Sequence, residues 1–221
     1  MTDRNYAAAL WNAAEEAIRA LDLSHTKLSV VGVLKIARYT TGGDIDRRRW
    51  AVEVLDAGYL GKDSPWEMHH IWADWVEVNA DRFKAILRDG ERACGEWLIH
   101  AHGTIYNLPH EPFVLFDIIA KKKRLTVDAV RELAHAHGFT TPHILSDGPP
   151  TCISESLNRL GHNGYHGADY TEGVVYRVER HGEVDFLAKY VRHDKVDGKY
   201  LESQTGQPPI WNIWPGAPKL W

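Results

Sequence analysis

Residues 172–192 read EGVVYRVERHGEVDFLAKYVR, and this stretch decides the fold. Apolar residues dominate Val174–Val178 and Val184–Val191, whereas the connection Glu179–Glu183 between them is polar and contains a glycine. Two such runs around a short polar connection predict an antiparallel hairpin. Glu172 opens the first strand and Lys189 lies in the second, so the hairpin would place a carboxylate and an ammonium on neighbouring strands.

The rest of the chain predicts further helices and strands. Apolar residues at three- and four-residue steps predict amphipathic helices, and short continuous apolar runs predict buried strands. The predicted helices are residues 5–21, Trp66–Leu87 and Val127–His137, with Thr126 as the cap of the last, and the predicted strands are Val30–Tyr39, Trp97–Ile99 and Phe113–Ile119. We find no internal repeat and no linker, so one domain is expected.

Composition limits the classes of function. The 221 residues are 44% hydrophobic, which suits one well-buried domain. A net charge of -4 removes the simplest argument for nucleic-acid binding, so contacts with phosphate must be local. The basic runs Arg47–Arg49 and Lys121–Arg124 could supply such contacts or could be solvated surfaces. Two distant cysteines suit a reducing cytoplasm, and without a signal peptide or a membrane-length apolar run we expect a soluble protein.

Three acids and a lysine stand next to or inside apolar runs. Glu96 precedes Trp97–Ile99, Asp117 follows Phe116 near the end of a strand, and Glu172 and Lys189 belong to the hairpin. Buried carboxylates are rare unless they are paired or bind something. A structural salt bridge is the alternative for Glu96. Together, the four charged residues predict a metal and phosphate site.

In order, these segments resemble the motifs of the phage-type RNA ligase 2 family, within the covalent nucleotidyltransferase superfamily of ATP-dependent ligases and capping enzymes. The resembling segments are Gly95–Leu98 with His102 and Tyr106 (motif III), Phe113–Ile118 (motif IIIa), Glu172–Val175 (motif IV) and Ala188–Arg192 (motif V). The resemblance implies an α+β fold in which twisted antiparallel sheets are flanked by helices, in a single adenylyltransferase domain over residues 1–221. Residues 58–213 are family-like, 1–57 are divergent, and 204–221 form an irregular tail.

The resemblance also implies a reaction. An ATP-dependent RNA ligase joins a 3′-hydroxyl to a 5′-phosphate through a lysyl-adenylate, with Mg²⁺ as the metal. By resemblance, Glu96 would hold the ribose, Phe116 would stack on adenine, and Asp117 would support the site. Glu172 would bind the metal, and Lys189 would neutralise the α-phosphate. The expected partners are ATP and nicked or broken RNA, without a membrane, for a monomer that repairs RNA in the cytoplasm, which for a phage protein would be that of the host.

The nucleophile is the least clear element. Motif I should read Lys-x-Asp-Gly or Lys-x-x-Gly before motif III, and no such segment occurs there. Lys27 is the predicted nucleophile, although Ser29 stands where the Asp is expected; Lys35 is an alternative, and a chain without a nucleophile is another. Lys195-Val196-Asp197-Gly198 matches the pattern but follows motif V, so we interpret it as a chance match.

The sequence leaves the second phosphate-binding cation and the class of activity undecided. Motif V usually offers two basic residues two positions apart, and here Val191 replaces the second, so Arg192 is predicted to contact the nucleotide instead. The chain could be an inactive nucleotide- or RNA-binding module, or a DNA ligase or capping-type enzyme. A hydrolytic zinc site is also conceivable; its histidines would come from His69, His70, His100, His102, His135 and His137.

Overall fold

The computed structural model describes residues 67–88, 90–120, 123–161, 167, 169–170, 172–196 and 198–216, together with the backbone of residues 26–32. The predicted helix over residues 5–21 and the basic run Arg47–Arg49 lie outside these ranges, as does the alternative nucleophile Lys35.

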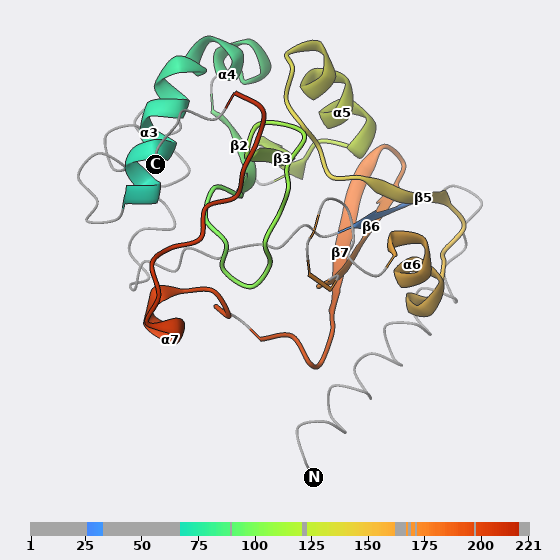
Figure 1. The fold of residues 1–221 in the computed structure, drawn as a ribbon. Coiled ribbons are helices and arrows are strands. Elements are labelled where there is room, and N and C mark those ends of the chain that lie inside the picture. The colour runs from blue at the N-terminus through green and yellow to red at the C-terminus, as the bar shows by residue number, and fades with distance from the viewer. Residues whose placement is uncertain are drawn as a thin grey trace.

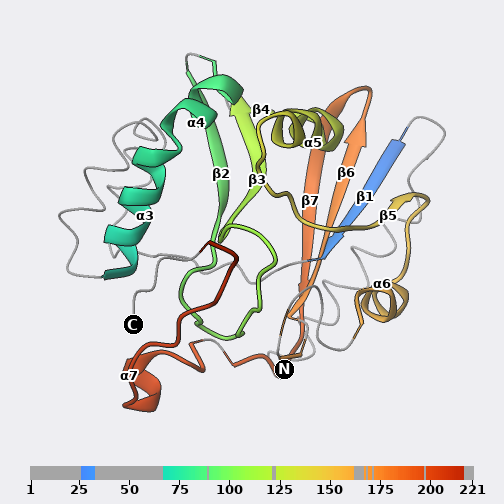
Figure 2. The same cartoon turned by 45° about the horizontal axis from the view of Figure 1, so that its top comes forward.

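Two antiparallel sheets stand side by side, with helices packed around them (Figures 1 and 2). The four-stranded sheet has the order β5 (Ile144–Gly148), β1 (Thr26–Gly32), β6 (Gly173–Arg180) and β7 (Glu183–Val191). The three-stranded sheet has the order β2 (Glu91–Trp97), β3 (Phe113–Ala120) and β4 (Lys123–Arg124). The predicted α+β class, antiparallel sheets flanked by helices, is therefore confirmed.

The hairpin that decides the fold is formed by β6 and β7. Its turn is the pair His181 and Gly182, whose φ angles of 52° and 76° are the positive values that two-residue hairpin turns favour. The turn is shorter than the predicted connection, and the register pairs Gly173 with Val191 and Val175 with Lys189. At Gly173 the strands approach so closely that a Cβ atom would overlap the carbonyl oxygen of Tyr190, so this position needs glycine.

The helices are α3 (Glu67–Val78), α4 (Ala80–Ile86), α5 (Val127–Ala136), α6 (Ile153–Leu160) and α7 (Glu202–Thr205). The prediction of one helix over Trp66–Leu87 was wrong, because Asn79 separates α3 from α4. Its side-chain amide donates to the Trp75 carbonyl at 2.8 Å and accepts from Arg82 at 2.5 Å, bonds that compete with helix continuation. The cap Thr126 is confirmed, since its side chain accepts from the Ala129 N–H.

Two strands begin earlier than predicted. The strand expected at Trp97–Ile99 is the end of β2, which begins at Glu91, and β1 begins at Thr26 rather than Val30. At Cys94 and Gly95 the pairing of β2 with β3 shifts register in a β-bulge. A Cβ atom on Gly95 would lie 2.5 Å from the Phe113 ring, so the bulge has room only for glycine.

The C-terminal segment has little regular structure but is packed against the rest of the molecule. In both views it crosses the loop between β2 and β3 (Figures 1 and 2). Asn212, which is 1% exposed, donates from its side chain to the Leu98 carbonyl at 2.6 Å and accepts from the Tyr106 N–H at 2.8 Å. Trp214 is buried in the core. Among the described residues, no helix is long and apolar enough to cross a membrane.

Candidate active site

A cavity of about 490 Å³ lies between the two sheets. Its lining comes from β3 on one side, from β6 and β7 on the other, and from the first residues of α5. Because Leu115 and Asp117 are two residues apart on β3, and Val175 and Arg177 are two apart on β6, each pair projects from one face of its strand into this space. The volume suits a small molecule the size of a nucleotide.

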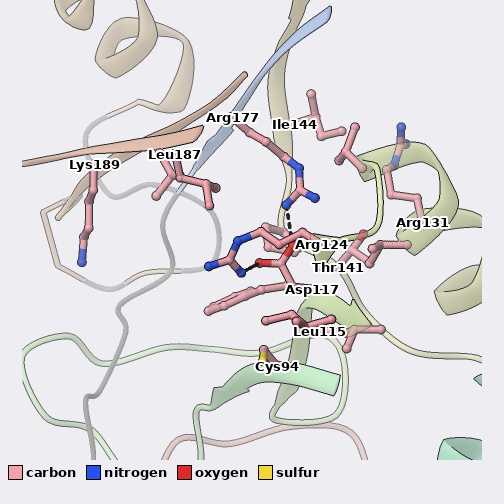
Figure 3. Close-up of a pocket in the computed structure, with 16 residues that line it drawn as sticks. Cys94, Leu115, Asp117, Arg124, Arg131, Thr141, Ile144, Arg177, Leu187 and Lys189 are labelled. Atoms are coloured by element: carbon pink, nitrogen blue, oxygen red, sulfur yellow. Dashed lines mark hydrogen bonds and ion pairs between the residues drawn. The ribbon is translucent and has the colours of Figure 1, made fainter. Parts of the chain in front are cut away.

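Three residues predicted from the sequence line this cavity, namely Phe116, Asp117 and Lys189. Lys189 reaches it from β7, where it is paired with Val175 of β6. Figure 3 shows Lys189 at one end of the lining and Arg131, from α5, at the other. An apolar wall with an aromatic ring and cations at its edges has the composition of a nucleotide pocket, since the ring can stack on a base and the cations can neutralise phosphate.

Asp117 joins the two sheets through buried ion pairs. Its two carboxylate oxygens accept from Arg177 of β6 and Arg124 of β4, each at 2.6 Å (Figure 3). Arg177 also donates from Nε to Glu179 at 2.7 Å and from its remaining nitrogen to the Leu125 carbonyl. Side-chain exposures of 5% for Arg177 and 8% for Asp117 make this a buried network. Asp117 therefore holds the cavity wall together.

The thiol of Cys94 lies in the same cavity, opposite Asp117 in the β2–β3 register. Burial raises the pKa of this thiol, and the negative charge of Asp117 raises it further. The thiol is therefore less reactive at neutral pH than an ordinary cysteine thiol. It can serve as a chemical reporter for whatever fills the cavity.

Glu96 and Glu172 are both buried but are not among the residues that line the cavity. Glu96 is 3% exposed and lies on β2 opposite Val114 of β3. Glu172 immediately precedes β6, and its carbonyl accepts from the Arg192 N–H at 2.9 Å, which extends the hairpin by one further pair. Its carboxylate forms an ion pair with Lys195.

Lys195 is the residue that the sequence led us to set aside. The turn after β7 carries it back to the hairpin end, where its Nζ contacts Oε1 of Glu172. The two side chains are 17% and 2% exposed, respectively, so the pair is largely shielded from water. The Lys-x-Asp-Gly pattern was the available signal, but nothing in the sequence indicated that residue 195 meets residue 172. Arg177 was not predicted at all, and Arg124 was predicted only as part of the basic run Lys121–Arg124, because the sequence does not show that both arginines meet Asp117.

Arg192, predicted to contact the nucleotide, has other partners. Its guanidinium carbon lies 5.0 Å from the centre of the Tyr170 ring, and its Nε lies 3.2 Å from Oδ1 of Asp194. Neither Arg192 nor either of these partners lines the cavity, and the same holds for Lys195. The basic run Lys121–Arg124 is described in part: Lys123 pairs with Glu183 at the surface, and Arg124 pairs with Asp117.

The register of β1 bears on the predicted nucleophile. The backbone of Lys27 pairs with Glu179, whereas Gly32 pairs with Val174, two residues from Glu172. At about 3.4 Å per residue, Lys27 lies roughly 17 Å farther from the Glu172 end of the sheet than Gly32 does. Lys35, three positions after Gly32 in the sequence, is outside the described residues.

The zinc-site interpretation of the histidines gains no support. His100 and His102 lie with their ring centroids 4.9 Å apart, and His100 also contacts the Trp211 ring. Within the described ranges, no group of three or more histidine, cysteine, aspartate or glutamate residues is arranged to hold a metal ion. The pair is better explained as part of the packing between the β2–β3 loop and the C-terminal segment.

Comparison with known proteins identifies the family. A model of the RNA ligase family matches residues 39–191, more than two thirds of the chain. The match contains Glu96, Phe116, Asp117, Glu172 and Lys189 and ends one residue before Arg192. Neither the curated proteins nor the solved structures gave a significant match. The chain therefore belongs to the RNA ligase family, as its ordered motifs predicted.

Proposed function

We propose that this chain is an ATP-dependent RNA ligase that joins a 3′-hydroxyl to a 5′-phosphate through a lysyl-adenylate. The observation that carries the proposal is the coincidence of two independent results. The RNA ligase match spans the segments that hold Phe116, Asp117 and Lys189, and these three residues line one cavity between the sheets. A family resemblance alone would not require its residues to meet.

Each residue that lines the cavity is proposed to contact a different part of ATP or to hold the cavity walls in place. The Phe116 ring offers a stacking surface for adenine against the apolar wall that contains Val175. Lys189 lines the cavity opposite Val175, which is three residues from Glu172, and its ammonium would neutralise the α-phosphate as negative charge builds up in the transition state. Asp117 keeps the two walls in place through its arginine partners. Glu96 is proposed to hold the ribose, from a position outside the cavity lining.

Glu172 fits the metal role that the family implies. Its side chain is buried, and Oε2 accepts no hydrogen bond from any described residue, so this oxygen keeps a lone pair for a cation. Mg²⁺ typically binds through one or two carboxylates, with water and substrate phosphate completing its shell. A site with a single described carboxylate is therefore sufficient. When bound, Mg²⁺ would supply Lewis-acid stabilisation of phosphate charge.

Two lysines, Lys27 and Lys35, are candidates for the residue that becomes adenylylated. Lys27 remains the prediction from the sequence, although the β1 register puts its backbone at the end of β6 that is remote from Glu172. Lys35 is the alternative and lies outside the described residues. Attack on ATP forms a phosphoramide bond from the lysine nitrogen to the α-phosphorus and releases pyrophosphate, after the amine has lost its proton.

Incubation with radiolabelled ATP and Mg²⁺ tests the proposal. We expect a labelled protein that survives denaturation, and label reduced about a hundredfold or more by Lys189→Met or Glu172→Gln. Lys84→Met is the matched control, since Lys84 is exposed on α4 and its ion pair is with the exposed Asp81 of the same helix. Peptide mapping would identify the labelled lysine and decide between Lys27 and Lys35.

An inactive binding module and an enzyme with another substrate predict different results. An inactive binding module would bind ATP in a calorimeter but take up no label. A DNA ligase or capping-type enzyme would become labelled and then transfer AMP or a nucleotide to nicked DNA or triphosphate-ended RNA. Comparison of these substrates with nicked RNA separates the three activities. The proposed partners are thus ATP and broken RNA, and a role in RNA repair would follow from a preference for nicked RNA.

A further inference from the structure

We infer that Lys195 is the second phosphate-binding cation of this site, the role that the sequence predicts for Arg192. The inference rests on the proposed function and extends it to a residue outside the family match, which ends at residue 191. It also accounts for a lysine that the motifs left without a role.

The first step is the position of the ammonium. Nζ of Lys195 contacts Oε1 of Glu172, the carboxylate proposed to bind the metal. A lysine in an ion pair with a buried carboxylate carries its positive charge into a region from which water is largely excluded. Such a position favours phosphate binding, because charge interactions strengthen as the surroundings become less polar.

Backbone hydrogen bonds hold Lys195 in place. Before it, the Arg192 N–H donates to the Glu172 carbonyl at 2.9 Å, and the Lys195 N–H donates to the Arg192 carbonyl at 3.3 Å. After it, the Tyr200 N–H donates to the His102 carbonyl at 2.7 Å. The loop is therefore anchored on both sides, and its lysine contacts Glu172, the residue that precedes the first strand of the hairpin.

The third step is the comparison with Arg192. Arg192 stacks over Tyr170, which is exposed, and pairs with Asp194, so the ionic partner of its guanidinium is Asp194 rather than Glu172. Val191 is apolar and offers no charge. Among the described cations that follow Lys189 in sequence, Lys195 is the one whose ion pair is with Glu172.

The step proposed for Lys195 is non-covalent. In the ligand-free protein, its ammonium neutralises Glu172. With nucleotide bound, the ammonium donates hydrogen bonds to a phosphate oxygen of ATP, and the four-carbon side chain allows the small movement that this exchange of partners needs. No bond is made or broken, and no further reactant is required.

ATP binding measured by calorimetry in EDTA tests this role without turnover. We expect Lys195→Met to weaken ATP binding about tenfold or more, which is typical of the loss of a charge-assisted hydrogen bond, and Lys195→Arg to restore most of the affinity. Arg192→Met is the matched control and should change the affinity less than about twofold.

The same substitution in Glu172→Gln protein distinguishes direct binding of phosphate by Lys195 from a purely structural role in neutralising Glu172. In Glu172→Gln protein, Lys195 has no buried charge to neutralise, so a purely structural lysine would become dispensable. We expect Lys195→Met to weaken ATP binding by a similar factor in this background. Equal ATP affinities with and without Lys195, or a larger loss in Arg192→Met, would overturn the inference. If the wild-type protein binds no ATP, the proposed function itself fails.

Discussion

Replacement of Asp117 by alanine should destabilise the protein by about 3 kcal/mol. Removal of one member of a buried ion pair costs roughly 3–5 kcal/mol, because the remaining charge stays buried without its partner. Arg177 would lose Asp117 but keep Glu179 and the Leu125 carbonyl, which places the expected loss at the lower end of that range. The Arg124 pair adds little, because that guanidinium is 36% exposed.

Urea unfolding followed by tryptophan fluorescence measures this free energy. Asp117→Asn should lose less, about 1–2 kcal/mol, because the amide oxygen still accepts a hydrogen bond from Arg177. Glu183→Ala is the surface control: its pair with Lys123 is 64% and 71% exposed, so the expected loss is below about 1 kcal/mol. A loss for Asp117→Ala no larger than that of Glu183→Ala would refute the claim that this network joins the sheets.

Further predictions concern the cavity and the acid side of the stability profile. Phe116→Leu should weaken ATP binding about tenfold in calorimetry while Phe116→Tyr keeps it, since stacking on a base contributes roughly 1–3 kcal/mol; equal affinities would exclude Phe116 as the stacking ring. Bound ATP should slow the reaction of Cys94 with a thiol reagent but not that of exposed Cys152, whose pKa is lowered by its hydrogen bond with Ser154; protection of neither thiol would place ATP elsewhere. Burial raises the pKa of Asp169, but hydrogen bonds, first from Tyr200, outweigh burial and leave it below its ordinary value. The ionised Asp169 therefore stabilises the protein above about pH 4, and this stabilisation is lost as the pH falls further. In urea unfolding below about pH 4, the free energy of unfolding of Asp169→Asn should therefore fall less with pH than that of the wild type.

The hairpin and the inner strand β3 were predictable because their side chains follow simple local rules. Apolar runs with a glycine-containing connection specify β6 and β7, and Phe113–Ala120 is apolar enough to predict its burial. Asn79 could not be recognised as a helix break, because the apolar spacing continues across it and its bonds to Trp75 and Arg82 depend on the folded structure.

The site was predictable only in part. Phe116, Asp117 and Lys189 were found because ordered motifs indicate residues that meet in space. Lys195 was not, because its place beside Glu172 depends on a turn and two anchoring hydrogen bonds distant in the chain. The strand β2 begins at Glu91, earlier than predicted, because its first residues are polar or small and only half-buried, a pattern that does not resemble a buried strand.

The central claim, that this chain joins RNA ends with ATP, is tested most directly by sealing of a nicked RNA duplex that carries a labelled 5′-phosphate at the nick. The account predicts that the wild-type protein with ATP and Mg²⁺ converts the labelled strand to the longer joined product. It also predicts that Lys189→Met and Glu172→Gln leave the strand at its original length and that Lys84→Met seals like wild type. A wild-type protein that binds ATP in its cavity yet forms neither an adenylylated protein nor a joined strand would contradict the account.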